Sequence, residues 1–190
     1  LALIEPGDEV IMPNPGFPIY ESMVEYVGAR PVFVKLKEED DFGFDLDAFQ
    51  SAISNRTRMV VLNSPSNPTG GVLSKDQLES IAEMLRDRSD ITILSDEIYS
   101  RMLYEGEHRS IAAEPDMLDR TVILDGYSKT YAMTGWRLGY GVMPPELAQA
   151  VTQLQINSTS CVNAATQFAG VEALQGPQDA VDEMVAAFKR

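Results

Sequence analysis

The sequence predicts an α/β fold whose mostly parallel sheet is covered by helices. Short apolar runs alternate along the chain with longer stretches in which apolar residues recur at helical spacing. Several of the short runs are apolar almost without interruption, as at residues 59–62 and 91–94. Such runs are typical of strands in a parallel sheet, because both faces of that sheet are buried.

The first part of the chain predicts three strands and two helices. The strands are expected where short apolar runs occur, at residues 8–12, 31–36 and 59–63. A helix is expected over residues 20–27, with Gly28 as its stop, and a short helix over residues 45–53. The acidic run at residues 38–41 is expected to be a solvated loop.

The second part of the chain continues the alternation. Ser74 is expected to cap a helix whose buried face carries Leu78, Ile81, Ala82 and Leu85. The remaining strands are expected at residues 91–95, 121–124 and 138–143. Helices are expected at residues 144–156 and 163–174, with Gly176 and Pro177 interrupting the chain before a last segment.

Composition narrows the classes of partner. The 190 residues carry 15 Lys and Arg against 29 Asp and Glu, which gives a net charge of −14. This balance argues against a nucleic acid or an anionic membrane surface as partner. No apolar run approaches the roughly 20 residues that span a bilayer. No signal peptide opens the chain, so the cytoplasm is the expected compartment.

The counts of cysteine and histidine narrow the chemistry. The single cysteine, Cys161, excludes an internal disulfide and a cysteine-rich metal site. The single histidine, His108, argues against metal sites and against Ser-His-Asp catalysis, so no metal is expected. We expect His108 to be an exposed loop residue and Cys161 to be a small buried side chain.

Residues 125–140 place one lysine where a cofactor can bind. An apolar run precedes this stretch, so Lys129 follows a predicted strand, with Gly126 and Ser128 near it and Arg137 eight positions later. A lysine in a cleft among small and hydroxyl side chains is well placed to bond covalently to a carbonyl cofactor. On this stretch alone, a surface loop with an incidental lysine and arginine remains the alternative.

Other reactive side chains also follow strands, at the sheet edge where ligands bind in α/β folds. Pyridoxal phosphate needs an amine for its aldehyde, a carboxylate for its ring nitrogen and hydrogen-bonding groups for its phenolic oxygen. It also needs a guanidinium for its phosphate and an aromatic face for its ring. The residues that follow the predicted strands offer this set: Lys129, Asp96, Asn67, Tyr99, Arg137 and Phe17.

Four motifs resemble those of the class I and II aminotransferases of fold type I, the aspartate aminotransferase-like enzymes. Residues 126–139 are similar to the signature around the cofactor lysine of that family. Pro-Ser-Asn-Pro-Thr-Gly at 65–70 resembles its Asn-Pro-Thr-Gly loop, Asp-Glu-Ile-Tyr at 96–99 its Asp-x-x-Tyr element, and Asn-Pro-Gly-Phe at 14–17 its aromatic segment. The resemblance implies a three-layer α/β/α fold. Residues 1–190 are then expected to form an incomplete PLP-binding large domain, without the N-terminal segment and the C-terminal small domain.

The resemblance also implies a role for each residue. Lys129 binds the cofactor covalently and, once released by substrate, moves the proton between the substrate Cα and the cofactor C4′. Asp96 pairs with the pyridinium nitrogen. Tyr99 and Asn67 hydrogen-bond the phenolic oxygen. Lys129, Asp96 and Tyr99 are therefore the expected catalytic residues.

The rest of the cofactor is implied to contact Arg137, at the phosphate, and Phe17, which stacks on the ring. Gly126 stands where many relatives carry a phosphate-binding serine, and we expect Ser128 to contribute to cofactor binding instead. The family's phosphate-binding turn and its arginine for the substrate carboxylate are expected to lie outside residues 1–190.

Two further expectations follow from the resemblance. The Asn14–Pro15 and Asn67–Pro68 peptide bonds resemble positions at which the family has cis bonds, whereas about 5% of X–Pro bonds are cis by default. Family members place their active sites between subunits, so a homodimer is expected, with the turn at residues 157–160 near its interface.

The predicted function is PLP-dependent transfer of an amino group between an L-amino acid and a 2-oxo acid, of the aspartate type. Alanine, aromatic and diaminopimelate-pathway specificities remain open. One alternative is another fold-type I enzyme, such as a C–S β-lyase, which would release pyruvate and ammonia. A second alternative is a non-catalytic, aminotransferase-like module that binds an effector. The 190 residues alone are expected to be inactive.

Overall fold

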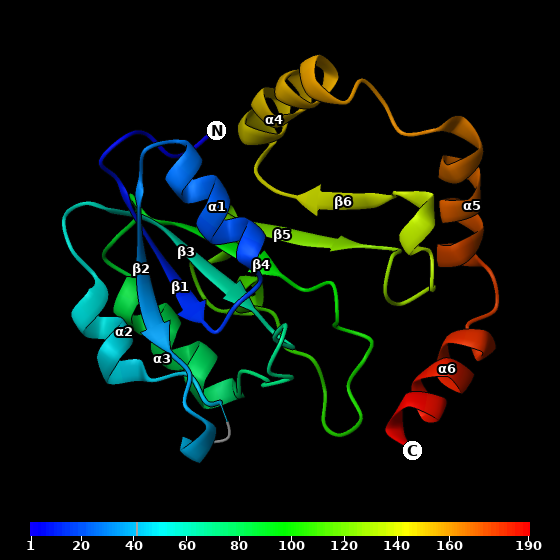
Figure 1. The fold of residues 1–190 in the computed structure, drawn as a ribbon, viewed down its shortest axis with the longest axis horizontal. Coiled ribbons are helices and arrows are strands. Elements are labelled where there is room, and N and C mark those ends of the chain that lie inside the picture. Colours follow the sequence, from blue (N-terminus) through cyan, green and yellow to red (C-terminus); the bar gives the residue numbers. More distant parts are fainter. Residues whose placement is uncertain (41) are drawn as a thin grey trace.

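The computed structural model describes residues 1–40 and 42–190, which contain a six-stranded sheet with helices on both faces (Figure 1). The strands are β1 (Glu9–Asn14), β2 (Arg30–Lys35), β3 (Thr57–Asn63), β4 (Thr92–Asp96), β5 (Thr121–Gly126) and β6 (Gly139–Val142). The helices are α1 (Pro18–Tyr26), α2 (Leu46–Ala52), α3 (Lys75–Leu85), α4 (Pro145–Ser158), α5 (Ala164–Gln175) and α6 (Asp179–Lys189).

The sheet is mostly parallel, as predicted. Its strand order is β2-β1-β3-β4-β5-β6, and every neighbouring pair is parallel except β5 and β6. All strands and helices expected from the sequence are present, with ends that differ by at most two residues from the expected ranges. β6 lies antiparallel at one edge, which is a common addition to a parallel sheet.

The alternation of side chains along the strands creates two apolar layers. Val10 and Met12 of β1 pack with Val24 of α1 on one face of the sheet. Ile11, between them in the sequence, faces the opposite side and belongs to a larger core that includes Phe49 of α2 and residues of α3. Successive strand residues point to opposite faces, so one strand serves both layers. The predicted three-layer α/β/α arrangement is therefore confirmed.

Helix α3 follows the sequence expectation closely. The Ser74 hydroxyl accepts from the Gln77 N–H, while the Gln77 side chain accepts from the Ser74 N–H. This reciprocal capping satisfies two backbone donors at the start of the helix. The buried residues of α3 are the predicted ones: Leu78, Ile81, Ala82 and Leu85.

Two loop expectations have different outcomes. Glu38–Asp40 form an exposed 3-10 turn, in keeping with a solvated acidic run, while Asp41 lies outside the described residues. The expectation that Cys161 is buried is wrong. Cys161 lies exposed in the connection between α4 and α5, and such connections run over the protein surface even where they carry small apolar side chains.

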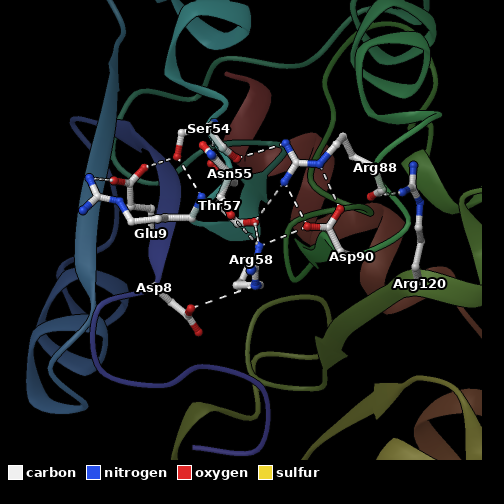
Figure 2. A network of polar contacts seen from close by, with 10 residues as sticks. Asp8, Glu9, Ser54, Asn55, Thr57, Arg58, Arg88, Asp90 and Arg120 are labelled. Carbon is white, nitrogen blue, oxygen red and sulfur yellow. Dashed lines mark hydrogen bonds and ion pairs between the residues drawn. The ribbon is translucent and has the colours of Figure 1, made fainter.

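A polar network occupies the edge of the sheet at which the parallel strands begin (Figure 2). Glu9, the first residue of β1, is 2% exposed. Its carboxylate accepts from the Ser54 hydroxyl at 2.7 Å and pairs with Arg30 at 2.7 Å and Arg56 at 2.6 Å. Nearby, Arg120 donates to carbonyls at the end of α3. These ionic contacts lie at the end of the sheet where the parallel strands begin, opposite the end where the strands finish.

No helix within residues 1–40 and 42–190 has the length and apolar character needed to cross a membrane.

Candidate active site

A cavity of about 270 Å³ lies beyond the carboxyl ends of the central strands, where α/β sheets place their ligands. Residues that follow β1, β3, β4 and β5 all reach it. The cavity is lined by every site residue expected from the sequence: Phe17, Asn67, Asp96, Tyr99, Ser128, Lys129 and Arg137. The fold thus brings together residues that are up to 120 positions apart in the chain.

Asp96 supplies a buried carboxylate to this cavity. It is the last residue of β4 and is 9% exposed. One carboxylate oxygen accepts from the Tyr20 hydroxyl of α1, and the other accepts from the Ile98 N–H at 3.2 Å. A buried carboxylate requires such donors, and here they also fix its direction.

Asn63 links the loop that carries Asn67 to the end of β4. Its amide nitrogen donates to the Asp96 carbonyl at 3.1 Å, and its amide oxygen accepts from the Asn67 N–H at 2.8 Å. Since Asn63 is buried at the end of β3, it holds Asn67 and Asp96 in a fixed relation.

Within residues 1–40 and 42–190, three X–Pro peptide bonds are cis. The Asn14–Pro15 and Asn67–Pro68 bonds are cis, which confirms both predictions. The Ser64–Pro65 bond is also cis and was not predicted.

The segment between β5 and β6 folds back so that its lysine and its arginine both reach the cavity. The Thr134 hydroxyl donates to the Ser128 carbonyl at 2.9 Å, and the Arg137 guanidinium donates to the Thr134 carbonyl at 2.9 Å. Arg137 adopts the left-handed conformation, with φ 56°, and this reverses the chain into the antiparallel β6. Lys129 and Arg137 therefore line one cavity although eight positions separate them.

Aromatic side chains lie beside the lysine and at the rim of the cavity. The Lys129 Nζ lies 5.6 Å from the centre of the Tyr99 ring, within the range of cation–π attraction. Phe17 is 44% exposed and meets Tyr20 edge to face, with ring centres 6.1 Å apart. Phe17 and Tyr20 therefore form an aromatic wall beside Asp96.

Sequence reasoning missed three residues of this region: Tyr20, Asn63 and Asp125. Tyr20 follows Phe17, the N-cap residue of α1, by three positions, and this closeness in the sequence was an available signal. Burial raises the pKa of Tyr20, as do the charge of Asp96 and the hydrogen bond to it. The Tyr20 hydroxyl therefore keeps its proton and stays a hydrogen-bond donor.

Asp125 lines the cavity as a second carboxylate. It accepts from the Gly126 N–H at 2.6 Å and from the Tyr140 hydroxyl at 3.0 Å. Burial raises the pKa of Asp125 above its usual range, and burial together with Asp125 raises the pKa of Tyr140 to about 12. This pair ties β5 to the edge strand β6 beside the cavity.

The backbone explains why glycine occupies position 126. Gly126 pairs with Gly139 across β5 and β6, and a Cβ on Gly126 would lie 2.8 Å from the Gly139 Cα and 3.1 Å from the Leu138 carbonyl oxygen. A serine at this position would therefore require the opposing backbone to shift.

His108 lies in a loop, as expected, but the expectation that it is exposed is wrong. The His108 side chain is 18% exposed, and its Nε2 lies 2.8 Å from a carboxylate oxygen of Glu97. Glu97 is 8% exposed and requires donors, which the loop carrying His108 supplies.

The side chains of the cavity fit pyridoxal phosphate. They comprise an amine, a buried carboxylate, a guanidinium, hydroxyl and amide groups and an aromatic ring, which are the groups that this cofactor requires. The volume lies near the lower end of small-molecule sites, which is about 300 Å³. Among residues 1–40 and 42–190, no three His, Cys, Asp or Glu side chains are grouped to hold a metal ion.

Comparison with known proteins identifies the family. The aminotransferase class I and II family model matches residues 1–190. An aspartate aminotransferase of a Bacillus species (strain YM-2) is 40% identical over 189 residues, which cover 98% of this chain and 48% of the relative. An asparagine–oxo-acid transaminase of Streptococcus mutans is 42% identical over 191 residues, with 99% and 48% covered.

Solved structures agree with this relationship. The structure of an aspartate aminotransferase from Rhizobium meliloti superimposes with a TM-score of 0.94 at 38% identity, over 100% of this chain and 48% of the other. The chain therefore spans about half the length of the relatives that it matches. With the family model matched over its whole length, the chain belongs to the class I and II aminotransferases, a family of pyridoxal phosphate-dependent transferases.

Proposed function

We propose that the whole protein carrying this chain transfers an amino group between an L-amino acid and a 2-oxo acid, with pyridoxal phosphate as its cofactor. The main support is the joint lining of one cavity by the Lys129 amine, the Asp96 carboxylate and the Arg137 guanidinium. The relatives named as aspartate aminotransferases support aspartate as the amino donor.

When bound, pyridoxal phosphate supplies an aldehyde for amines and a ring that accepts the electrons left when the substrate loses its α-proton. Lys129 is the residue proposed to hold the cofactor covalently and to move the proton at the substrate Cα. Asp96, oriented by Tyr20 and the Ile98 N–H, keeps the ring nitrogen protonated.

The remaining side chains bind and orient the cofactor in this proposal. Tyr99 and Asn67 hydrogen-bond its phenolic oxygen. Arg137 and Ser128 bind its phosphate, for which a guanidinium fork is well suited. Phe17 covers one face of its ring.

We also propose that residues 1–190 form part of the cofactor-binding domain and that the protein is a homodimer. Large apolar side chains on α4 and α5 are 42–78% exposed and offer a surface for a second copy: Leu154, Ile156, Phe168, Val171 and Leu174. Sedimentation of the whole protein as a monomer at assay concentration would contradict the dimer.

The proposed function is tested with Lys129→Ala in the whole protein. The wild type should develop a visible absorbance band with pyridoxal phosphate, and borohydride reduction followed by mass spectrometry should locate the cofactor on Lys129. Lys129→Ala should lose both, and amino transfer from aspartate to a 2-oxo acid should fall by at least about a hundredfold, because the proton carrier is missing.

Lys75→Ala is the matched control, since Lys75 is an exposed lysine of α3 that pairs with Glu79. It should behave as wild type. A wild-type protein without a lysine-dependent band would contradict cofactor binding. Release of ammonia in place of transfer to the 2-oxo acid would instead identify a lyase.

A further inference from the structure

Glu97 is a buried carboxylate that the proposed chemistry does not use. It directly follows Asp96 at the end of β4 and is 8% exposed. Its N–H donates to the Leu124 carbonyl of β5 at 2.8 Å, and its carbonyl accepts from the Ser100 N–H at 2.8 Å. Glu97 thus begins the turn that carries Tyr99 away from the sheet.

Three side chains surround the Glu97 carboxylate. One oxygen accepts from the Ser95 hydroxyl at 2.9 Å and from the Ser110 hydroxyl at 2.5 Å, and the other lies 2.8 Å from the His108 Nε2. Burial acts to raise the pKa of Glu97, but the hydrogen bonds from His108, Ser110 and Ser95 together outweigh it, so the pKa is lowered. Glu97 is therefore a fully engaged anion, and His108 donates to it.

His108 makes this contact with one ring nitrogen only. Its Nδ1 is buried and has no hydrogen-bond partner among the described residues. Among the described residues, Glu97 is therefore the hydrogen-bond partner of the His108 ring.

The contact closes a loop whose other polar contacts with distant segments are exposed. Residues 100–110 form no helix or strand. Outside the Glu97 cluster, the loop is held by α6 through exposed contacts, from Lys189 to the Tyr104 carbonyl at 2.9 Å and from Arg101 to Asp182 at 3.7 Å. Exposed ion pairs contribute little to stability. The buried anchor of the loop is therefore the cluster of Glu97, His108 and Ser110.

Tyr99 lies in the chain between Glu97 and His108, the two residues whose contact anchors the loop. It follows Glu97 by two positions, and its ring faces the Lys129 amine at 5.6 Å. Asp96, in contrast, is held within the sheet by its neighbours on β3 and β5. Loss of the anchor would therefore release Tyr99 before it disturbed Asp96.

We propose that Glu97 and His108 are positioning residues that hold Tyr99 at the cofactor cavity through the buried contact between the Glu97 carboxylate and the His108 Nε2. This inference rests on the proposed function, because the role of Tyr99 is to contact the cofactor. Neither Glu97 nor His108 lines the cavity, so both act through Tyr99.

The test measures the dissociation constant for pyridoxal phosphate, by absorbance, in the whole protein. His108→Ala should weaken binding by about tenfold, because a misplaced contact group loses much of its effect. His108→Gln should weaken it less, since the glutamine amide can also donate to Glu97. In a Tyr99→Phe background, His108→Ala should have a smaller effect, because the hydroxyl that it positions is already absent.

Glu9→Gln is the matched control, because it also alters a buried carboxylate with ionic partners, at the far edge of the sheet. It should lower thermal stability without changing cofactor affinity. Where His108→Ala does not fold, Glu97→Gln replaces it, with the same expected weakening and the same dependence on Tyr99.

Two results would overturn the inference while the proposed function stands: wild-type cofactor affinity in the folded variants, or equal weakening with and without the Tyr99 hydroxyl. A wild-type protein with no lysine-dependent binding would overturn the inference and the proposed function together.

Discussion

Asp96 shows how much of the site depends on single donors from distant parts of the chain. Its carboxylate is held by the Tyr20 hydroxyl, which comes from α1, and by a backbone N–H two residues ahead. The carboxylate is 9% exposed, so water replaces a missing donor poorly. Tyr20 therefore contributes both to folding and to the direction in which Asp96 points.

Tyr20→Phe should lower the free energy of unfolding by about 1–3 kcal/mol at neutral pH, because one buried carboxylate oxygen loses its donor. Urea denaturation of the whole protein measures this, and the affinity for pyridoxal phosphate should fall in parallel. Tyr26→Phe is the control, since Tyr26 lies on the same helix and is 77% exposed. Equal unfolding midpoints for the two variants would contradict the role of Tyr20.

At the scale of elements, the junction of β5 and β6 determines where Lys129 and Arg137 lie. The two strands approach closely at Gly126 and Gly139, where neither residue has a side chain. The intervening segment closes through the contact from Arg137 to the Thr134 carbonyl. The close antiparallel pairing of β5 with β6 therefore brings Arg137 back to the cavity that Lys129 lines.

Gly126→Ala should destabilise the protein by about 1–3 kcal/mol, because the added methyl group lies within contact distance of the opposing backbone, which must move. Gly135→Ala is the matched control, since a Cβ there meets no atom within 4 Å. The two variants are compared by thermal and urea unfolding. If Gly126→Ala were as stable as Gly135→Ala, the close approach of the strands would not be the reason for glycine.

At the scale of the whole molecule, buried carboxylates lie at both ends of the parallel strands. Glu9 lies where β1 begins, and Glu97 lies directly after β4 ends. The hydrogen bond from Ser54 lowers the pKa of Glu9, burial opposes it, and Arg30 and Arg56 lower it further. Burial acts to raise the pKa of Glu97, but its three hydrogen bonds outweigh burial and lower the pKa.

Both folded-state pKa values lie below the ordinary value of 4.5, so each group stabilises the fold above that pH. This stabilisation should be lost as the pH falls below 4.5 and through the lowered pKa values. In that range the unfolded state binds protons on these carboxylates more readily than the folded state does. Urea midpoints from about pH 7 to about pH 3 measure the loss. Glu9→Gln should flatten this profile, whereas Glu38→Gln, at an exposed position, should not. Parallel profiles for wild type and Glu9→Gln would contradict the assignment.

Sequence patterns predicted the helices, the strands and most of the side chains that line the cavity. Apolar runs predicted the strands to within two residues, because a strand buried on both faces must be apolar throughout. The capping pattern at Ser74 predicted α3 because capping is local. Lys129, Asp96 and Arg137 were singled out because each was expected after a predicted strand, in motifs that resemble those of a family.

Contacts between segments far apart in the chain follow from the three-dimensional fold and not from local sequence patterns. Tyr20 and Asp96 are 76 positions apart, and neither sequence neighbourhood reveals the bond between them. The partly buried His108 contacts a carboxylate 11 positions away, and Cys161 is exposed in a loop that runs over the surface. Local periodicity encodes the elements, whereas a buried polar group takes its partner from whichever segment the fold brings beside it.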